Sequence, residues 1–203
     1  MKKLLLAGVA ALSVLRTSAS AAEIIVVPAK LSTTISGQMN MVVLKGKMEQ
    51  SDILVLRHKI EALNQGSDYK TAISLDSPGG DSTAGIFIGN YVRTNQWITT
   101  VPPHKGCLSA CAIIWLSGVK RYLSSRSSIG FHSIAFATDP SKRNDNGNDI
   151  VGAYLRAIDV PEILIQRIYK TPPTSMDYMY RSEAIKLGLL GNPPTLDFWP
   201  LSQ

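Results

Sequence analysis

The chain has 203 residues, of which 45% are hydrophobic and 18% are charged, so it can bury a core and is not a disordered chain. Lys2, Lys3 and Arg16 lie in the first 21 residues; removing them from the 21 basic residues leaves 18 against 15 acidic ones, a net charge of +3. This balance is typical of an ordinary surface and excludes a strongly basic nucleic-acid interface.

The N-terminus predicts an export signal. Lys2 and Lys3 precede an apolar run, and three small residues at 19–21 supply a cleavage site. The run is shorter than the roughly 20 apolar residues that span a bilayer, and no later segment is long and apolar enough. We therefore expect a signal peptide at 1–21, a single domain at 22–203, and an exported protein, periplasmic if the host has two membranes.

Strands and helices alternate along residues 23–132, which predicts a layered α/β fold. Apolar, β-branched runs predict strands, and apolar residues at helical spacing, such as Ile53, Leu56 and Ile60, predict helices. The expected strands are 23–27, 41–44, 71–75, 97–101, 122–123 and 128–132, and the expected helices are 51–64, one that begins at Ser82 and includes Val92, and 109–116.

A polar segment then interrupts the alternation. Residues 136–149 are rich in asparagine, charged residues, proline and glycine, which predicts a surface loop. Helices are expected at 150–158, 161–170 and 182–187, with a break at 171–174. Pro161 stands at the start of the second of these, where its missing N–H is tolerated.

The loop Ser77-Pro78-Gly79-Gly80 joins an expected strand to an expected helix. Glycines allow backbone angles that other residues avoid, so such a turn can point a free N–H at an anion. An ordinary strand-to-helix turn has the same composition. The lysine and glycine spacing of a phosphate-binding loop is absent.

Ser109 opens an expected apolar helix, where the backbone N–H groups and the helix dipole favour negative charge. The small residue Ala110 follows, and its N–H could join that of the glycine loop. Acyl transfer by serine needs a nucleophile, a base and oxyanion donors, and this region offers the first and the last. A serine that only caps the helix explains the same pattern.

His132 ends a short apolar strand and could act as the base for Ser109. The alternative is a core histidine whose ring nitrogens are satisfied. A triad also needs an acid to orient the imidazole. Several aspartates follow His132, and the residues alone do not select one: Asp139, Asp145, Asp149, Asp159 and Asp177.

The two cysteines, Cys107 and Cys111, flank Ser109. Export would place them where disulfides form, and a bridge needs a turn that brings the two Cβ atoms close. Two buried free thiols are the alternative. Metal binding is disfavoured because the chain has no third cysteine and only His104 lies near the pair, fewer than the four ligands of a structural zinc site, and we expect neither a metal nor another cofactor.

Together the motifs resemble the Clp protease proteolytic-subunit family of the ClpP/crotonase-like superfamily, and more closely a group of exported ClpP-like proteins of bacteria. The similarity covers about residues 40–190. It rests on Ser77-Pro78-Gly79-Gly80-Asp81, on the helix of Ser109 followed by Ser117-Gly118 and Arg121-Tyr122, on Gly130-Phe131-His132, and on Ser182-Glu183-Ala184 with Gly188-Leu189.

This resemblance implies a single α/β domain built as a spiral of ββα units. It implies that Ser109 is the nucleophile, His132 the base and Asp177 the acid, with an oxyanion hole made by the amides of Gly80 and Ala110. The substrate would be a peptide or an unfolded protein, cut without a cofactor.

The long helix that builds the family's double ring is replaced here by the polar loop and two shorter helices. We therefore expect no tetradecameric chamber, although a smaller homo-oligomer remains open. An exported protein would also have no ATP-driven unfoldase beside it. The leading prediction is an ATP-independent serine peptidase or related acyl hydrolase of the cell envelope.

Three other classes share parts of the pattern. A non-catalytic binding protein could use the same fold, since a fold does not determine a function. A crotonase-like acyl-CoA enzyme would share the paired oxyanion donors, but coenzyme A is a cytoplasmic cofactor. A serine–lysine peptidase could use Lys120, Lys142 or Lys170, and no spacing favours one of them.

Overall fold

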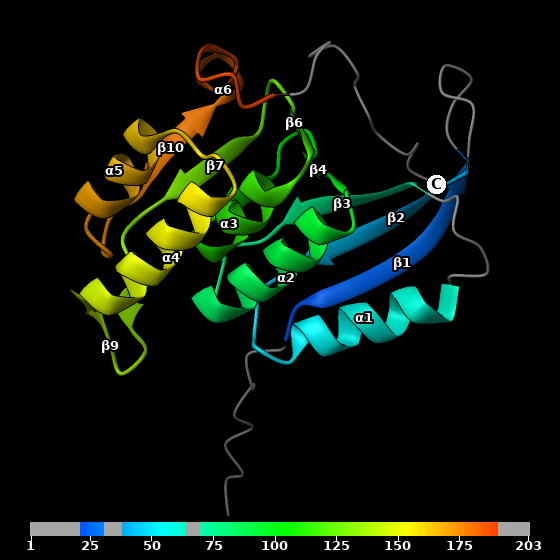
Figure 1. Ribbon diagram of the computed structural model, residues 1–203, viewed down its shortest axis with the longest axis horizontal. Coiled ribbons are helices and arrows are strands. Elements are labelled where there is room, and N and C mark those ends of the chain that lie inside the picture. Colours follow the sequence, from blue (N-terminus) through cyan, green and yellow to red (C-terminus); the bar gives the residue numbers. More distant parts are fainter. Residues whose placement is uncertain (1–20, 31–37, 64–69, 191–203) are drawn as a thin grey trace, which may run out of the picture.

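Five strands form the main sheet of the computed structural model, which describes residues 21–30, 38–63 and 70–190 (Figure 1). The order is β1-β2-β3-β4-β6; β1 is antiparallel to β2, and the other neighbouring strands are parallel. The strands are β1 Glu23–Lys30, β2 Gln38–Lys45, β3 Lys70–Asp76, β4 Ile98–Val101 and β6 Lys120–Leu123. The predicted export signal, apart from Ala21, lies outside the described residues.

Helices connect the parallel strands of this sheet. α1 (Asp52–Leu63) leads from β2 to β3, and α2 (Ser82–Thr94) leads from β3 to β4. Parallel neighbours require such crossovers, and the predicted α/β class is confirmed. In the described part of the chain, no helix combines the length and the apolar character needed to cross a membrane.

A second, smaller sheet has the order β10-β7-β5 and carries the candidate site. β5 (Gly106–Leu108) and β7 (Ser128–Phe131) are parallel, whereas β10 (Asp177–Tyr180) is antiparallel to β7. Ser109 directly follows β5 and His132 directly follows β7. Because the carboxyl ends of parallel strands lie at the same edge of a sheet, the two residues come together there.

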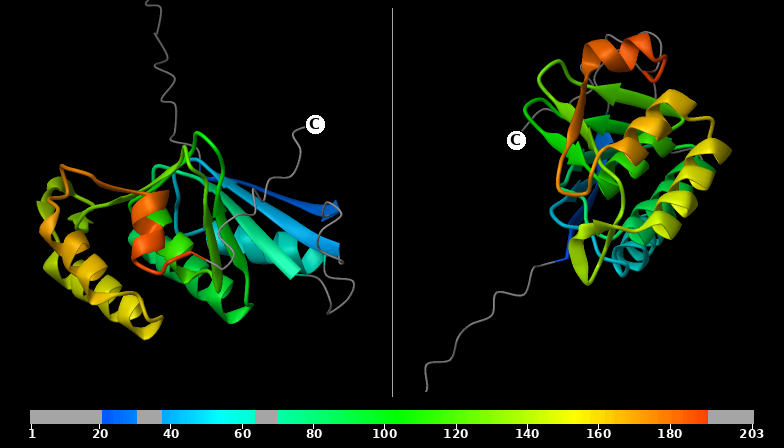
Figure 2. Two further views of the ribbon diagram at one scale, coloured as in Figure 1. Left: turned by 90° about the horizontal axis from the view of Figure 1, so that it is seen from above. Right: turned by 90° about the vertical axis from the view of Figure 1, so that its left-hand side faces the viewer.

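Helix α3 (Ala110–Ser117) begins at this edge, and all its residues are buried. Its cover includes α2 and α4 (Asp145–Ala157), and α5 (Glu162–Lys170) packs on α4. Figures 1 and 2 show α4 and α5 at the opposite end of the molecule from β1, with α3 between them. The short helix α6 (Arg181–Lys186) follows β10.

The segment 136–149 is not a continuous loop. It contains most of a two-stranded hairpin, β8 (Ala135–Phe136) and β9 (Asp139–Arg143), and the first turn of α4. Asn144 caps that helix, since its side chain accepts a hydrogen bond of 3.0 Å from the Gly147 N–H. The sequence did not reveal the hairpin because β9 has no buried residue and therefore no apolar alternation.

Glycines on α2 allow it to approach α3 closely. A Cβ placed on Gly85 would lie 2.7 Å from the Ala110 carbonyl oxygen and 3.2 Å from the Ala110 Cβ. These atoms belong to the first turn of α3, so they cannot move without moving the residue that follows Ser109. The close approach thus holds the start of α3 in place.

We expect Gly85→Ala to lower the free energy of unfolding by about 1–3 kcal/mol, because the backbone clash exceeds the roughly 1 kcal/mol that alanine gains over glycine in a helix. Urea unfolding measures the change. Asn90→Ala is the control, since Asn90 lies on the exposed side of the same helix and should be neutral or slightly stabilising. An equal effect of both changes would contradict the close packing.

Candidate active site

The backbone of Ser109 is the main feature of the site. Ser109 stands between β5 and α3 with φ 55° and ψ −125°, angles that a residue with a side chain rarely adopts. Such a conformation costs about 1–3 kcal/mol and persists only where its surroundings impose it. A sharp, strained strand-to-helix turn is a known way to expose a nucleophilic hydroxyl.

The alternative that Ser109 only caps the helix is wrong. Its side chain makes no capping hydrogen bond, and α3 lacks the extended N-cap geometry that α2 has at Asp81. Instead the Ser109 N–H donates to the Gly130 carbonyl at 2.8 Å, which ties the turn to β7. The hydroxyl is therefore not committed to the helix end.

The glycine loop is paired with β5. The Ser77 N–H donates to the Gly106 carbonyl at 3.0 Å, and the Leu108 N–H donates to the Ser77 carbonyl at 3.0 Å. The Ser77 hydroxyl donates to the Gly46 carbonyl at 2.6 Å and accepts from the Gly79 N–H at 3.0 Å. These bonds fix the loop against the strand that leads into Ser109.

Both glycines of the loop have positive φ and touch neighbouring backbone. A Cβ on Gly79 would lie 2.7 Å from the Ser109 Cβ and 3.1 Å from the Ala110 nitrogen, and one on Gly80 would lie 2.2 Å from the Met48 carbonyl oxygen. Only glycine fits at either position. The loop is thus in direct contact with the turn of Ser109.

The amides of Gly80 and Ala110 keep their N–H groups available. Ala110 is the first residue of α3, where an N–H has no intrahelical acceptor. The Gly79 carbonyl and the Asp81 N–H bond to Met48, and within the described residues no hydrogen bond uses the Gly80 N–H. Both amides are therefore free to donate to a ligand.

His132 and Ser109 line one pocket, and both are half-buried. His132 Nδ1 lies 2.8 Å from the Ser133 carbonyl oxygen; because that oxygen can only accept, Nδ1 carries the proton and Nε2 of the neutral ring is free to accept one. The rest of the pocket is apolar, with Ile113 and Leu116 from α3, Ile134 beyond β7, Val151 from α4 and Ile168 from α5.

The resemblance implied that Asp177 orients His132, but the structure does not join these two residues. Asp177 lies on β10 opposite Phe131, the residue before His132. Both of its oxygens accept hydrogen bonds from Arg167, each at 2.8 Å, and Arg167 also bonds to Glu183 at 2.5 Å. The hydrogen bonds from Arg167 lower the pKa of Asp177, and the group connects α5, β10 and α6.

The lysines that a serine–lysine peptidase would need lie elsewhere. Lys120 and Lys170 are exposed, and Lys142 is exposed beside Asp139 at 3.3 Å. None of the three lines the pocket of Ser109. A lysine base is normally desolvated so that it can be neutral, and these three are not. Among the described residues no cluster of His, Cys, Asp and Glu could hold a metal ion either.

Cys107 and Cys111 are joined by a disulfide with a Cα–Cα distance of 5.1 Å. Both residues are fully buried, one on β5 and the other in the first turn of α3. The bridge therefore spans the strained turn that presents Ser109.

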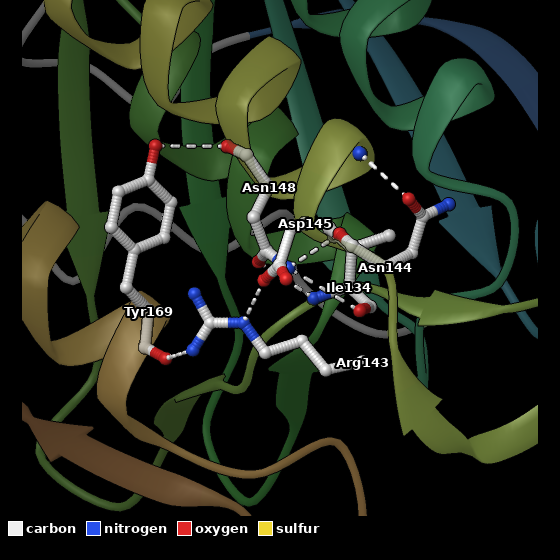
Figure 3. Close-up of polar contacts among 7 residues, drawn as sticks. Ile134, Arg143, Asn144, Asp145, Asn148 and Tyr169 are labelled. Carbon is white, nitrogen blue, oxygen red and sulfur yellow. Dashed lines mark hydrogen bonds and ion pairs between the residues drawn. The ribbon is translucent and has the colours of Figure 1, made fainter.

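Sequence reasoning missed a polar network around the start of α4, which Figure 3 shows. Asn148 is buried, and its side chain bonds to the backbone of Ile134, two residues beyond His132. Tyr169 donates to the Asn148 carbonyl at 3.0 Å, and Arg143 bonds to the Tyr169 carbonyl and to Asp145. The only signal in the sequence was the run of asparagines, which also predicts a loop.

No protein-family model and no curated protein sequence matches the chain. Solved structures do match it. Two of them are the 1510-N membrane-bound stomatin-specific protease, one a serine-to-alanine mutant and one a lysine-to-alanine mutant in complex with a substrate peptide. Each has a TM-score of 0.58; the identities are 17% and 18%, over 73% of this chain and 75% and 71% of theirs.

The chain has the ClpP/crotonase-like fold. The identities are too low to carry more than the fold, so the chemistry of this ClpP-like domain has to be argued from its own residues. The resemblance that the motifs indicated is confirmed at that level.

We expect the two cysteines of the protein, purified without reductant, to resist alkylation, and to gain two alkyl groups after reduction of the unfolded chain. Mass spectrometry measures this, and two alkylated thiols in the untreated protein would overturn it.

Replacing both cysteines with serine should lower the free energy of unfolding by about 2 kcal/mol, the entropic value for so short a loop.

We expect Asp177→Asn to destabilise the fold by about 1–2 kcal/mol at neutral pH, because it removes a charged hydrogen-bond pair that is partly exposed. Since the folded-state pKa of Asp177 is lowered, its contribution is present above the ordinary carboxyl pKa of about 3.9 and is lost as the pH falls through the lower value. The two proteins should therefore converge in acid, as unfolding curves over pH will show.

Asp139→Asn is the control for this change, because Asp139 is a carboxylate on the exposed hairpin and should matter little at any pH. The structural role of Asp177 would be contradicted if Asp177→Asn left the stability unchanged and lowered turnover about 10⁴-fold. A loss of that size is expected when the acid of a catalytic triad is removed.

Proposed function

We propose that the protein is an ATP-independent serine peptidase, or a related acyl hydrolase, in which Ser109 is the nucleophile and His132 the base. The observation that carries the proposal is the backbone of Ser109, held at positive φ against the loop of Gly79 and in one pocket with a histidine. The protease fold of the structural neighbours supports it.

The chemistry follows from these positions. The Ser109 oxygen attacks the acyl carbon while His132 Nε2 takes the hydroxyl proton, and the acyl oxygen becomes an oxyanion. The amides of Gly80 and Ala110 donate to that oxyanion. His132 then gives the proton to the leaving amine, and water, deprotonated by the same nitrogen, releases the acid and restores Ser109.

Apart from Ser109 and His132, the walls of the pocket are aliphatic and aromatic side chains. The pocket has a volume of about 10 Å³, room for no more than about one water, so it does not select a substrate side chain. We propose peptides or unfolded chains as the substrate class.

Export is part of the proposal. It is supported by the signal-like N-terminus and by a disulfide that an oxidising compartment would maintain. Outside the cytoplasm no ATP-driven unfoldase would be present, so the protein would act on short or already unfolded chains. A homo-oligomer is compatible with the proposal and is not required by it.

A non-catalytic binding protein is the second candidate. The observation in its favour is that Arg167 holds Asp177, so among the described residues His132 has no carboxylate partner. The same site would then bind an extended peptide without cutting it. Reactivity of Ser109 separates the two candidates.

We expect a fluorophosphonate probe to label the mature protein on Ser109, because an activated serine attacks phosphorus as it attacks an acyl carbon. Ser109→Ala should abolish the labelling, and His132→Ala should slow it by several orders of magnitude, since nucleophile and base act as a unit. Gel fluorescence and peptide mass spectrometry measure the rate and the site.

Ser117→Ala is the matched control, because Ser117 lies on the same helix and its hydroxyl bonds to Ile113 and Tyr154 instead of facing the pocket. It should label at the wild-type rate. A folded wild-type protein that never reacts would favour the binding protein, and labelling that survives Ser109→Ala would assign the reaction to another residue.

A further inference from the structure

One peptide unit lies directly beside the ring of His132. The carbonyl of this unit belongs to Ser133 and accepts the hydrogen bond from His132 Nδ1 at 2.8 Å. Its N–H belongs to Ile134 and donates to the side-chain oxygen of Asn148 at 2.9 Å. Hydrogen bonds therefore run without a break from the imidazole through the Ser133–Ile134 peptide to Asn148.

The side chain of Asn148 is fixed in the orientation that this requires. It is only 1% exposed, and its Nδ2 donates to the Asn144 carbonyl at 2.7 Å and to the Ile134 carbonyl at 3.4 Å. A flipped amide would place Oδ1 against those two carbonyl oxygens, which repel it. Tyr169 holds the Asn148 backbone from α5. Figure 3 shows this arrangement.

The peptide is held from its other side as well. The Ser133 N–H donates to the Thr171 carbonyl at 2.9 Å, so the chain after His132 is bonded to α5 and α4 together. The nearest predicted acid, Asp177, is bound by Arg167. Among the described residues, the Ser133 carbonyl is thus the group that orients the imidazole.

We propose that Asn148 is a positioning residue for His132, which acts through the Ser133–Ile134 peptide in the place where a triad has a carboxylate. The inference rests on the proposed role of His132 as the base. By accepting the Ile134 N–H, Asn148 fixes the plane of the peptide and polarises its carbonyl, because hydrogen bonds in a chain strengthen one another. The proton is thereby kept on Nδ1, and Nε2 remains available to Ser109.

The test reads the tautomer of His132 and therefore needs no substrate. Long-range ¹⁵N–¹H correlation spectra of the neutral imidazole distinguish Nδ1–H from Nε2–H. The signal is assigned among the three histidines by its loss in His132→Gln. We expect the Nδ1–H form in the wild-type protein and a growing share of Nε2–H in Asn148→Ala.

Two further variants separate positioning from general loosening of the fold. Tyr169→Phe removes one hydrogen bond of the same network and leaves the Ile134 amide paired, so the tautomer should not change. Asn148→Ser is too short to accept from the Ile134 amide, but its hydroxyl can bond to the Asn144 carbonyl four residues earlier, so it serves as the test if Asn148→Ala does not fold. In that case a folded Asn148→Ser protein that keeps the Nδ1–H form overturns the proposal.

Labelling of Ser109 by the fluorophosphonate supplies the second readout. We expect Asn148→Ala to slow the reaction about 10–100-fold, the scale of a misplacement of about 1 Å. A wild-type protein that shows the expected tautomers and never labels would overturn the proposed function and leave the positioning role. A labelling rate and a tautomer that Asn148→Ala leaves unchanged would overturn the positioning role and leave the function.

Discussion

The strained turn at Ser109 is the constraint on which the rest of the site depends. A serine at φ 55° is unfavourable by itself, so its neighbours must impose that angle. Three contacts do so: the hydrogen bond to Gly130, the pairing of Ser77 with β5, and the disulfide that bridges the turn. Together they connect both sheets and α3 at one point, which lets the fold hold a conformation that the local chain resists.

The parallel pairing of β5 and β7 explains why nucleophile and base meet. The register places Leu108 beside Gly130, so Ser109 is one residue and His132 two residues beyond this pair, and both leave the sheet at the same edge. Apolar side chains from α3, α4 and α5 line the pocket at this edge. The packing of α3 against these helices therefore shapes the surroundings of both Ser109 and His132.

The electrostatics around His132 differ from those of a carboxylate-based triad. Arg167 forms two hydrogen bonds with Asp177 and a third with Glu183, an arrangement that links three elements and leaves no free carboxylate oxygen on Asp177. A buried asparagine and a peptide unit occupy the position beside the imidazole. A neutral partner stabilises the imidazolium less than a carboxylate does.

The sequence by itself determined the α/β class, most helices and strands, and the roles considered for Ser109, His132 and the glycine loop, because local periodicity and short motifs carry that information. Tertiary structure decided the rest. The partner of Asp177 is Arg167, ten residues earlier on α5, and the contact of Asn148 with Ile134 depends on a hairpin with no buried side chain. Such pairings are set by three-dimensional packing, so no spacing along the chain could have identified them.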